Sequence, residues 1–240
     1  MYQNYVFDLY GTLADIRTNE WDMRLWEKLS EFYKMHGADY NPKELNWLYD
    51  VYVKEEQESV HRNHPFFENI DIKIDKVFRR MYEHKGVYPS HELVHETGLF
   101  FRRTSRLYIR LYPGIRELLD DLKKVGKIYL LTNAQRTFTW DELEVIGIRD
   151  DFDGIIISSD EECSKPDICF YNTLIDRFNI DPEKTIMVGN DPITDIKGGL
   201  RAGFDTLYIH SNISPAIKYD TGTTYFIPDG DTLKMRDYLL

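Results

Sequence analysis

The sequence predicts an α/β protein, a Rossmann-like and mostly parallel sheet flanked by helices, with an all-helical cap domain. From Pro113 onward, short apolar runs alternate with segments of helical period, which is typical of βαβ units. Between residues 15 and 108, strand patterns nearly vanish and the chain is charged, aromatic and helical in period. We therefore expect a core domain at 1–14 and 109–240 and a cap domain at 15–108.

The expected core strands follow one another with helices between them. The first strand is Asn4 to Asp8, and it ends in a turn that contains Gly11. Further strands are expected at Lys127–Thr132, Ile155–Ile157, Thr185–Gly189, Thr206–His210 and Thr224–Ile227. Apolar side chains at helical spacing indicate the intervening helices, as in Ile115, Leu118, Leu119 and Leu122.

Composition excludes several classes of protein. The 240 residues include 41 acidic and 30 basic side chains, a net charge of −11, so a surface for a nucleic-acid backbone is not expected. No apolar run has the ~20 residues of a membrane span, and the N-terminus lacks the basic and apolar regions of a signal peptide. We expect a cytoplasmic protein in which Cys163 and Cys169 are reduced thiols.

Polar residues follow four of the predicted strands at the point where each strand ends. They are Asp8 to Thr12, then Thr132 with Asn133, then Lys165, and finally Asn190 and Asp191 with Asp195. Ligands of open parallel sheets bind beyond the carboxyl ends of the strands, so these clusters are expected to meet. Together they suit a small anionic substrate, a carboxylate nucleophile and a divalent metal ion.

The same clusters carry a resemblance to a known family. Segments 7–13 (FDLYGTL), 131–133 (LTN), 164–167 (SKPD) and 188–199 (VGNDPITDIKGG) resemble, in this order, the four motifs of haloacid dehalogenase-like (HAD) hydrolases. Members of this family often insert a helical cap between the first and second motifs. The resemblance implies that Asp8 attacks the substrate and forms a covalent aspartyl intermediate.

The resemblance also implies roles for the other site residues. Asp8, Tyr10 and Lys165 would take part in catalysis, and Thr12, Thr132, Asn133, Lys165 and Asn190 would bind the substrate or its phosphate. Asp8, the carbonyl of Tyr10 and Asp191 would hold Mg²⁺, and Asp195 would orient Lys165. Asp191 is preferred to Asn190 as the metal ligand because a charged oxygen binds Mg²⁺ better.

Two positions depart from the family's phosphatases and leave three functions open. Tyr10 stands where a second aspartate usually acts as general acid and base, which resembles the 2-haloacid dehalogenases instead. The fourth motif reads Gly-Asn-Asp rather than Gly-Asp, yet its acids favour a metal-dependent enzyme. We favour a Mg²⁺-dependent phosphatase of a small phosphorylated metabolite, with a dehalogenase as the alternative and an impaired, phosphate-ligand-binding protein as the third.

The cap sequence is less informative. Arg102, Arg103, Arg106 and Arg110 are expected on a solvated helix face. Because a cap of this kind selects the substrate, the sequence indicates neither the substrate nor an oligomeric state.

Overall fold

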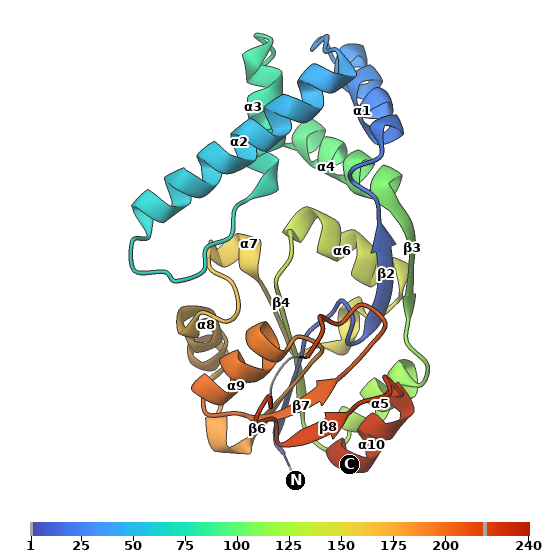
Figure 1. The fold of residues 1–240 in the computed structure, drawn as a ribbon, viewed down its shortest axis with the longest axis vertical. Helices are drawn as coiled ribbons and strands as arrows, with labels where there is room; N and C mark the ends of the chain where they lie inside the picture. Colours follow the sequence, from blue (N-terminus) through green and yellow to red (C-terminus); the bar gives the residue numbers. More distant parts are fainter. Residues whose placement is uncertain (1, 218–219) are drawn as a thin grey trace.

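The computed structural model describes residues 2–217 and 220–240, which form a sheet-based core with a helical cap above it (Figure 1). The sheet has six parallel strands in the order β5-β4-β1-β6-β7-β8. The strands are β1 (Asn4–Phe7), β4 (Lys127–Thr132), β5 (Gly154–Ile157), β6 (Thr185–Gly189), β7 (Asp205–Ile209) and β8 (Tyr225–Ile227).

Strand β1 lies at the centre of the sheet and is hydrogen-bonded on both edges. Phe7 is level with Leu130 of β4 on one side and with Val188 of β6 on the other. All four residues of β1 and all five of β6 are buried, as expected when helices cover both faces of a parallel sheet. The predicted Rossmann-like class is confirmed, and β4 and β6 have the predicted bounds.

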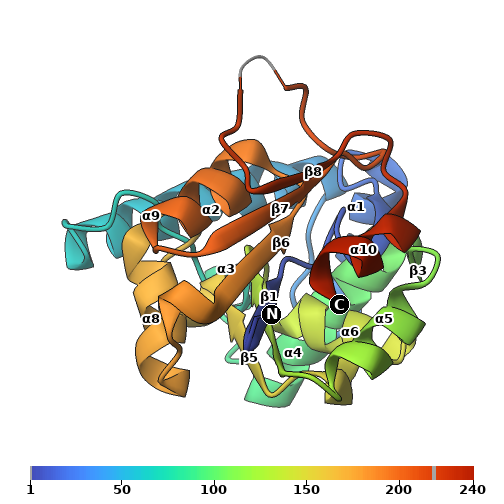
Figure 2. The same cartoon turned by 90° about the horizontal axis from the view of Figure 1, so that it is seen from below.

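Helices cover both faces of the sheet (Figure 2). On one face lie α5 (Ile115–Leu122), α6 (Arg136–Val145) and α10 (Met235–Leu239), which pack against Tyr5 and Phe7. On the opposite face lie α8 (Ile168–Phe178) and α9 (Gly198–Arg201), and Val6 joins the cluster that includes α8. The remaining helices are α7 (Ser158–Glu161), η1 (Arg149–Asp151), η2 (Pro182–Lys184), η3 (Pro192–Lys197) and η4 (Thr232–Lys234).

The cap consists of four helices with their own apolar core. They are α1 (Met23–Met35), α2 (Pro42–Asn63), α3 (Ile74–His84) and α4 (His91–Ser105). Asn41 starts α2 with a capping box, in which its side chain and that of Glu44 each accept a backbone N–H bond. Phe138 of α6 inserts into the apolar cluster of the cap, so the two domains also share packing.

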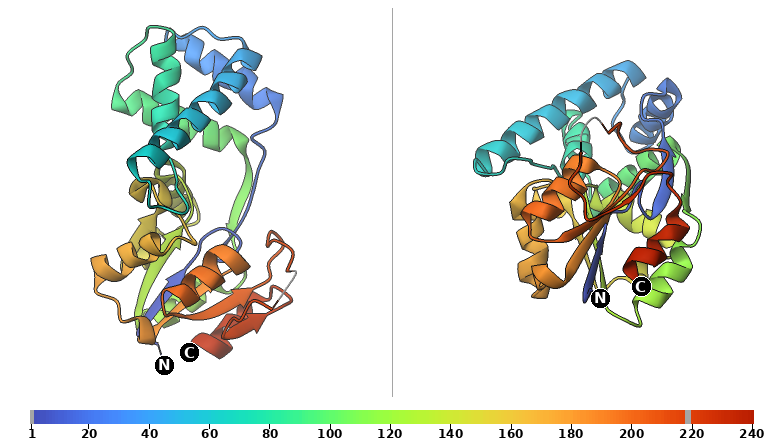
Figure 3. Two further views of the ribbon diagram at one scale, coloured as in Figure 1. Left: turned by 60° about the vertical axis from the view of Figure 1, so that its left-hand side comes forward. Right: turned by 60° about the horizontal axis from the view of Figure 1, so that its bottom comes forward.

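Two strands join the cap to the core, where the sequence predicted helix. Antiparallel β2 (Ala14–Thr18) and β3 (Arg106–Leu111) run side by side between the domains (Figure 3). The range 15–108 is therefore not entirely helical. Both strands are short and contain charged residues. Their pattern of polar and apolar residues is as compatible with the exposed face of a helix as with a strand.

Two further expectations can be compared with the structure. The Sγ atoms of Cys163 and Cys169 lie against each other across the loop that carries Lys165, and the reduced state of these cysteines stays a prediction. Among the described residues, no helix has both the length and the apolar character needed to cross a bilayer.

Candidate active site

The four polar clusters meet at the carboxyl edge of the sheet. Asp8 follows β1, Thr132 ends β4, and Asn190 follows β6, and these three strands are adjacent in the sheet. Lys165 comes from the loop after β5 and α7. The strand order thus brings together residues that are far apart in the chain.

Lys165 lies between two carboxylates in a buried ion triad. Its Nζ is 2.8 Å from Oδ1 of Asp8 and 2.7 Å from Oδ1 of Asp195, and its side chain is 1% exposed. Burial alone would lower the pKa of Lys165, but the charges of Asp195 and Asp8 raise it above its ordinary value. Burial raises the pKa of Asp195 to about 6, against the opposing effect of Lys165. The ammonium group therefore stays charged beside Asp8.

Asn133 fixes the backbone of Lys165. Its Oδ1 accepts a bond from the Lys165 N–H at 2.8 Å, and its Nδ2 donates to the Lys165 carbonyl at 2.9 Å. Both ends of the amide are thus engaged by one residue. In this structure Asn133 positions Lys165, and it also lines the cavity beneath the cap.

Thr12 contacts the Asp8 carboxylate and Thr132 ends the neighbouring strand β4, and the two hydroxyls differ in their bonding. Thr12 Oγ1 donates to Oδ2 of Asp8 at 3.3 Å. Thr132 Oγ1 is buried and has no hydrogen-bond partner among residues 2–217 and 220–240. A buried hydroxyl without a hydrogen-bond partner destabilises the folded protein. The Thr132 hydroxyl can therefore donate a hydrogen bond to an acceptor atom of a ligand that enters the site.

The loop after β6 uses its three polar residues differently. Asp195 Oδ2 accepts the N–H groups of Asn190 and Asp191, at 3.0 and 2.9 Å. Asp191 Oδ1 caps η3 by accepting the N–H groups of Ile193 and Thr194. The Asn190 side chain lies against the first-motif loop, since a Cβ on Gly11 would come within 2.2 Å of its Nδ2.

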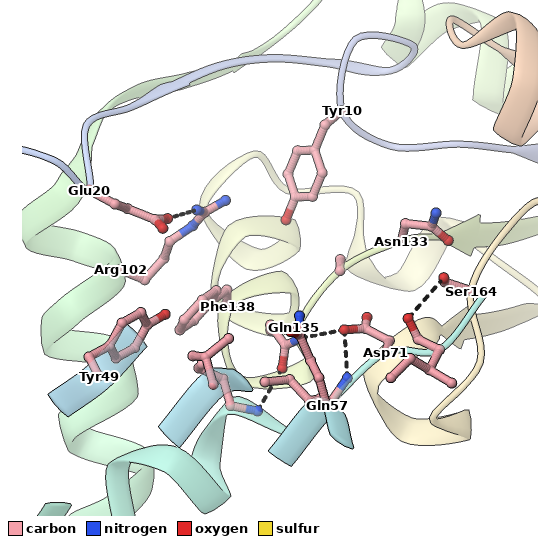
Figure 4. Close-up of a pocket in the computed structure, with 15 residues that line it drawn as sticks. Tyr10, Glu20, Tyr49, Gln57, Asp71, Arg102, Asn133, Gln135, Phe138 and Ser164 are labelled. Atoms are coloured by element: carbon pink, nitrogen blue, oxygen red, sulfur yellow. Dashed lines mark hydrogen bonds and ion pairs between the residues drawn. The ribbon is translucent and has the colours of Figure 1, made fainter. Parts of the chain in front are cut away.

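The Tyr10 side chain points into the cavity beneath the cap, on the side of Arg102 (Figure 4). Its hydroxyl donates to Oε2 of Glu142 at 2.5 Å, and Glu142 is also bound by Nε of Arg102 at 2.8 Å. Burial, followed by the charge of Glu142, raises the pKa of Tyr10. The sequence did not single out Glu142, because an acid in the middle of a helix resembles an ordinary surface residue.

The arginines differ from their expected position. The side chains of Arg102 and Arg106 are 12% and 13% exposed and pair with Glu142. For these two, the prediction of a solvated helix face is wrong, because the core lies against them. Arg103 and Arg110 are more exposed. Arg106 and Arg110 also belong to β3 rather than to a helix.

A cavity of about 540 Å³ lies between the core and the cap. The core side of the cavity is lined by Tyr10, Asn133 and Ser164. Tyr10 lies two residues after Asp8, Asn133 adjoins Thr132, and Ser164 adjoins Lys165. Its other walls include Glu20, Tyr49, Gln57, Asp71, Arg102 and Phe138 (Figure 4). The cavity is therefore placed to hold the part of a substrate that extends from the reacting group.

The loop before α3 closes one end of this cavity against the core. The Asp71 N–H donates to the carbonyl of Glu162 at 3.1 Å, and the Ser164 N–H donates to that of Asn69 at 2.9 Å. Asp71 accepts a bond from Gln135 at 3.1 Å and one from Ser158 at 2.5 Å. Cap and core thus meet beside Lys165 as well as at Glu142.

Comparison with known families identifies the fold and its chemistry. The family model described as haloacid dehalogenase-like hydrolase matches residues 2–203. The chain belongs to the haloacid dehalogenase-like hydrolases. This membership confirms the resemblance of the four motifs and makes the protein a hydrolase.

Relatives and solved structures of HAD hydrolases agree with this assignment. The chain is 27% identical over 210 residues to N-acylneuraminate-9-phosphatase of Mus musculus, covering 86% of this chain and 82% of that protein. Its match to the Rattus norvegicus protein of the same name is 26% identical over 151 residues and spans 61% of that protein. The crystal structure of a 2-haloacid dehalogenase from Pseudomonas syringae pv. Tomato superposes with a TM-score of 0.72, at 21% identity and over 100% of this chain and 98% of that one.

Proposed function

We propose that this HAD hydrolase is a Mg²⁺-dependent phosphatase of a small phosphorylated metabolite, with Asp8 as the nucleophile. The observation that carries the proposal is the ion triad of Asp8, Lys165 and Asp195 beside the unpaired Thr132 hydroxyl. A carboxylate approaches an anionic phosphate poorly unless cations offset the repulsion. Lys165 supplies one cation at the attacking oxygen, and the free Thr132 hydroxyl supplies a donor.

The reaction has two steps at one carboxyl group. Oδ of Asp8 attacks phosphorus, the bond to the leaving oxygen breaks, and an aspartyl phosphate forms. Water then attacks phosphorus, which releases phosphate and restores the Asp8 carboxylate. Lys165 is held by Asp195 and by both ends of the Asn133 amide, so its charge stays fixed beside the reacting oxygens throughout.

The oxygen donors at the carboxyl edge suit Mg²⁺. Asp8 and the carbonyl of Tyr10 would hold the ion from the first motif, together with one side chain from the loop after β6. The contact of Asn190 with Gly11, and the engagement of Asp191 Oδ1 in capping η3, support Asn190 for that place rather than the expected Asp191. The bound ion would supply positive charge against the phosphate oxygens.

The curated relatives add independent support. The Mus musculus protein is named for hydrolysis of a phosphate ester, and so is phosphoserine phosphatase of Thermus thermophilus, which is 29% identical over 142 residues. The substrates of those two enzymes differ, so the support extends to a phosphorylated small molecule and not to a particular compound.

A dehalogenase is the second candidate, and two residues favour it. Tyr10 and Asn190 are both uncharged where the phosphatases of the family carry acids, which lowers the negative charge available to bind a metal ion. A halide also leaves without a proton, so displacing it requires no acid at position 10.

One experiment separates these activities. Wild type, Asp8→Asn and the control Asp120→Asn, which changes an exposed carboxylate on α5, are assayed with p-nitrophenyl phosphate and with 2-chloropropionate. We expect Mg²⁺-dependent phosphate release that EDTA and Asp8→Asn abolish and that Asp120→Asn leaves intact. Chloride release without phosphate release would establish the dehalogenase instead.

A further inference from the structure

Glu20 and Arg102 form an ion pair in the wall of the cavity beneath the cap. Figure 4 shows this pair on one side of the cavity, with Asn133 and Ser164 on the other. Asn133 and Ser164 adjoin residues of the phosphate site, so a phosphate bound there directs the rest of a substrate across the cavity toward the ion pair. The charges of Glu20 and Arg102 therefore bear on which substrates fit.

Arg102 is the only cationic side chain among the described residues that line this cavity. Its Nη1 donates to Oε1 of Glu20 at 3.2 Å, and its Nε donates to Oε1 of Glu142 at 2.8 Å. The surrounding ion pairs balance three arginines against three carboxylates, namely Arg102, Arg103 and Arg106 against Glu20, Asp141 and Glu142. This cluster therefore has no excess positive charge with which to bind a second anionic group of a substrate.

Glu20 keeps one carboxylate oxygen without a partner. Its Oε1 accepts the bond from Arg102, and no bond to its Oε2 is found among the described residues. The side chain is 38% exposed, while its backbone carbonyl accepts a bond from the indole N–H of the buried Trp26 at 3.0 Å. The backbone of Glu20 is thus fixed, and Oε2 is able to accept a hydrogen bond from a substrate hydroxyl.

Asp71 is the second carboxylate in the wall of the cavity, and its oxygens are already engaged by the protein. It accepts hydrogen bonds from the side chains of Gln135 and Ser158 and from the backbone N–H of Ile72. Glu20 is therefore the wall carboxylate with an oxygen available to a substrate.

We propose that Glu20 selects phosphate esters in which the rest of the molecule is uncharged and carries hydroxyl groups. This inference rests on the proposed phosphatase function and names its class of substrate. A hydroxyl at the far end of such an ester donates to Oε2 of Glu20. A carboxylate in the same place meets a like charge and a guanidinium that is already paired, and like charges brought together by binding weaken it strongly.

Selection by size alone is the competing explanation, and two pairs of ligands separate charge from size. One pair is glycerol 3-phosphate and 3-phosphoglycerate, and the other is sorbitol 6-phosphate and 6-phosphogluconate. Within each pair only the carbon farthest from the phosphate differs, since it carries a hydroxyl in the first ester and forms a carboxylate in the second. The two pairs differ in length, so they sample two depths of the cavity.

The test is competitive inhibition of Mg²⁺-dependent hydrolysis of p-nitrophenyl phosphate by the full chain, which measures binding of each ester whether or not that ester is hydrolysed. In wild type we expect the hydroxyl ester to bind at least about 30-fold more tightly than its carboxylate partner in at least one pair. Glu20→Gln removes the like charge and leaves the arginine cluster with an excess positive charge, so this ratio should fall at least about tenfold. The control Glu27→Gln changes an exposed carboxylate on α1 and should keep the wild-type ratio within about twofold.

Glu20→Ala keeps the proposal testable if Glu20→Gln folds poorly, because the same fall in the ratio is expected. Equal binding within both pairs in wild type, failure of both hydroxyl esters to inhibit, or a wild-type ratio in Glu20→Gln would overturn the role of Glu20 alone. A fall of the ratio in Asp71→Asn and not in Glu20→Gln would also overturn it. A wild type that does not hydrolyse p-nitrophenyl phosphate would overturn the phosphatase function and with it the substrate class.

Discussion

Lys165 and Asp8 are 157 residues apart in the chain, and their charged atoms lie 2.8 Å apart. The pair is buried, and Asp195 on the other side of Lys165 makes it a triad with two negative charges and one positive. A site of this kind carries an excess of negative charge until a cation or a cationic group of a ligand enters. Its components should therefore differ in how they affect stability and activity.

Replacing the charged side chain of Lys165 should lower both the stability and the activity of the protein. Lys165→Met leaves two buried carboxylates without their partner, so we expect the free energy of unfolding to fall by about 3 kcal/mol and turnover to vanish. Asp8→Asn should also abolish turnover, but it removes one of the two like charges and should leave stability within about 1 kcal/mol of wild type. Urea unfolding and phosphate release measure the two effects. Equal destabilisation by both variants would contradict the triad.

The metal requirement should depend on Asn190. Replacing the amide by a carboxylate in Asn190→Asp should lower the Mg²⁺ concentration for half-maximal activity by about tenfold, because a charged oxygen binds this ion more strongly. Asp191→Asn keeps the cap of η3, since asparagine caps helices well, and should leave that concentration unchanged. Titration of turnover with Mg²⁺ checks both. A shift in Asp191→Asn with none in Asn190→Asp would instead make Asp191 the ligand.

At the boundary between the domains, replacing Arg102 should lower stability much more than replacing Arg103. Arg102→Ala leaves the buried Glu142 with fewer donors, so we expect a loss of about 3 kcal/mol in the free energy of unfolding. The Arg103 side chain is 58% exposed, and its replacement by alanine should cost less than about 1 kcal/mol. Similar urea midpoints for the two variants would mean that Glu142 does not depend on Arg102.

Asp71 gives a pH-dependent prediction. Burial raises the pKa of this carboxyl above its ordinary value of 3.8, although Ser158, Ile72 and Gln135 donate to it. The folded state thus holds this proton more tightly than the unfolded state does, so stability due to Asp71 is lost as the pH rises above 3.8. Wild type should therefore lose melting temperature relative to Asp71→Asn as the pH rises above 3.8. The exposed Asp120→Asn should show no such trend against wild type.

The core of the protein was predictable because strong local signals agree with the topology. The apolar runs of β4 and β6 are buried on both faces and leave little freedom in where each strand begins and ends. The polar clusters after the strands were also readable, since a parallel sheet collects whatever follows its strands at one edge. The sequence alone therefore predicts that Asp8 and Lys165 lie close together.

The sequence was least informative where two domains meet. Charged residues such as Arg102 and Glu142 are usually exposed to solvent. These two are buried and paired only because the cap lies over α6. The sequence also failed to predict the β2–β3 pair. Short charged strands lack a polar and apolar pattern that would distinguish them from a helix. Which oxygen of Asp191 caps η3, and which way Asn190 faces, depend on contacts of single atoms that no spacing encodes.

At Thr132, the effect of the unpaired hydroxyl on stability can be measured separately from its effect on activity. Its hydroxyl is buried without a partner in the described chain, so Thr132→Val replaces an unsatisfied group by a methyl group of similar size. We expect the free energy of unfolding to rise by about 1 kcal/mol, while kcat/KM for a phosphate ester falls at least about tenfold and inhibition by inorganic phosphate weakens. Thr206→Val is the matched control, because Thr206 is equally buried but bonds to Thr223 and Thr224. That variant should lose stability and keep its kinetic constants. If Thr132→Val behaved in the same way, the Thr132 hydroxyl would be a structural group and not one that receives the phosphate.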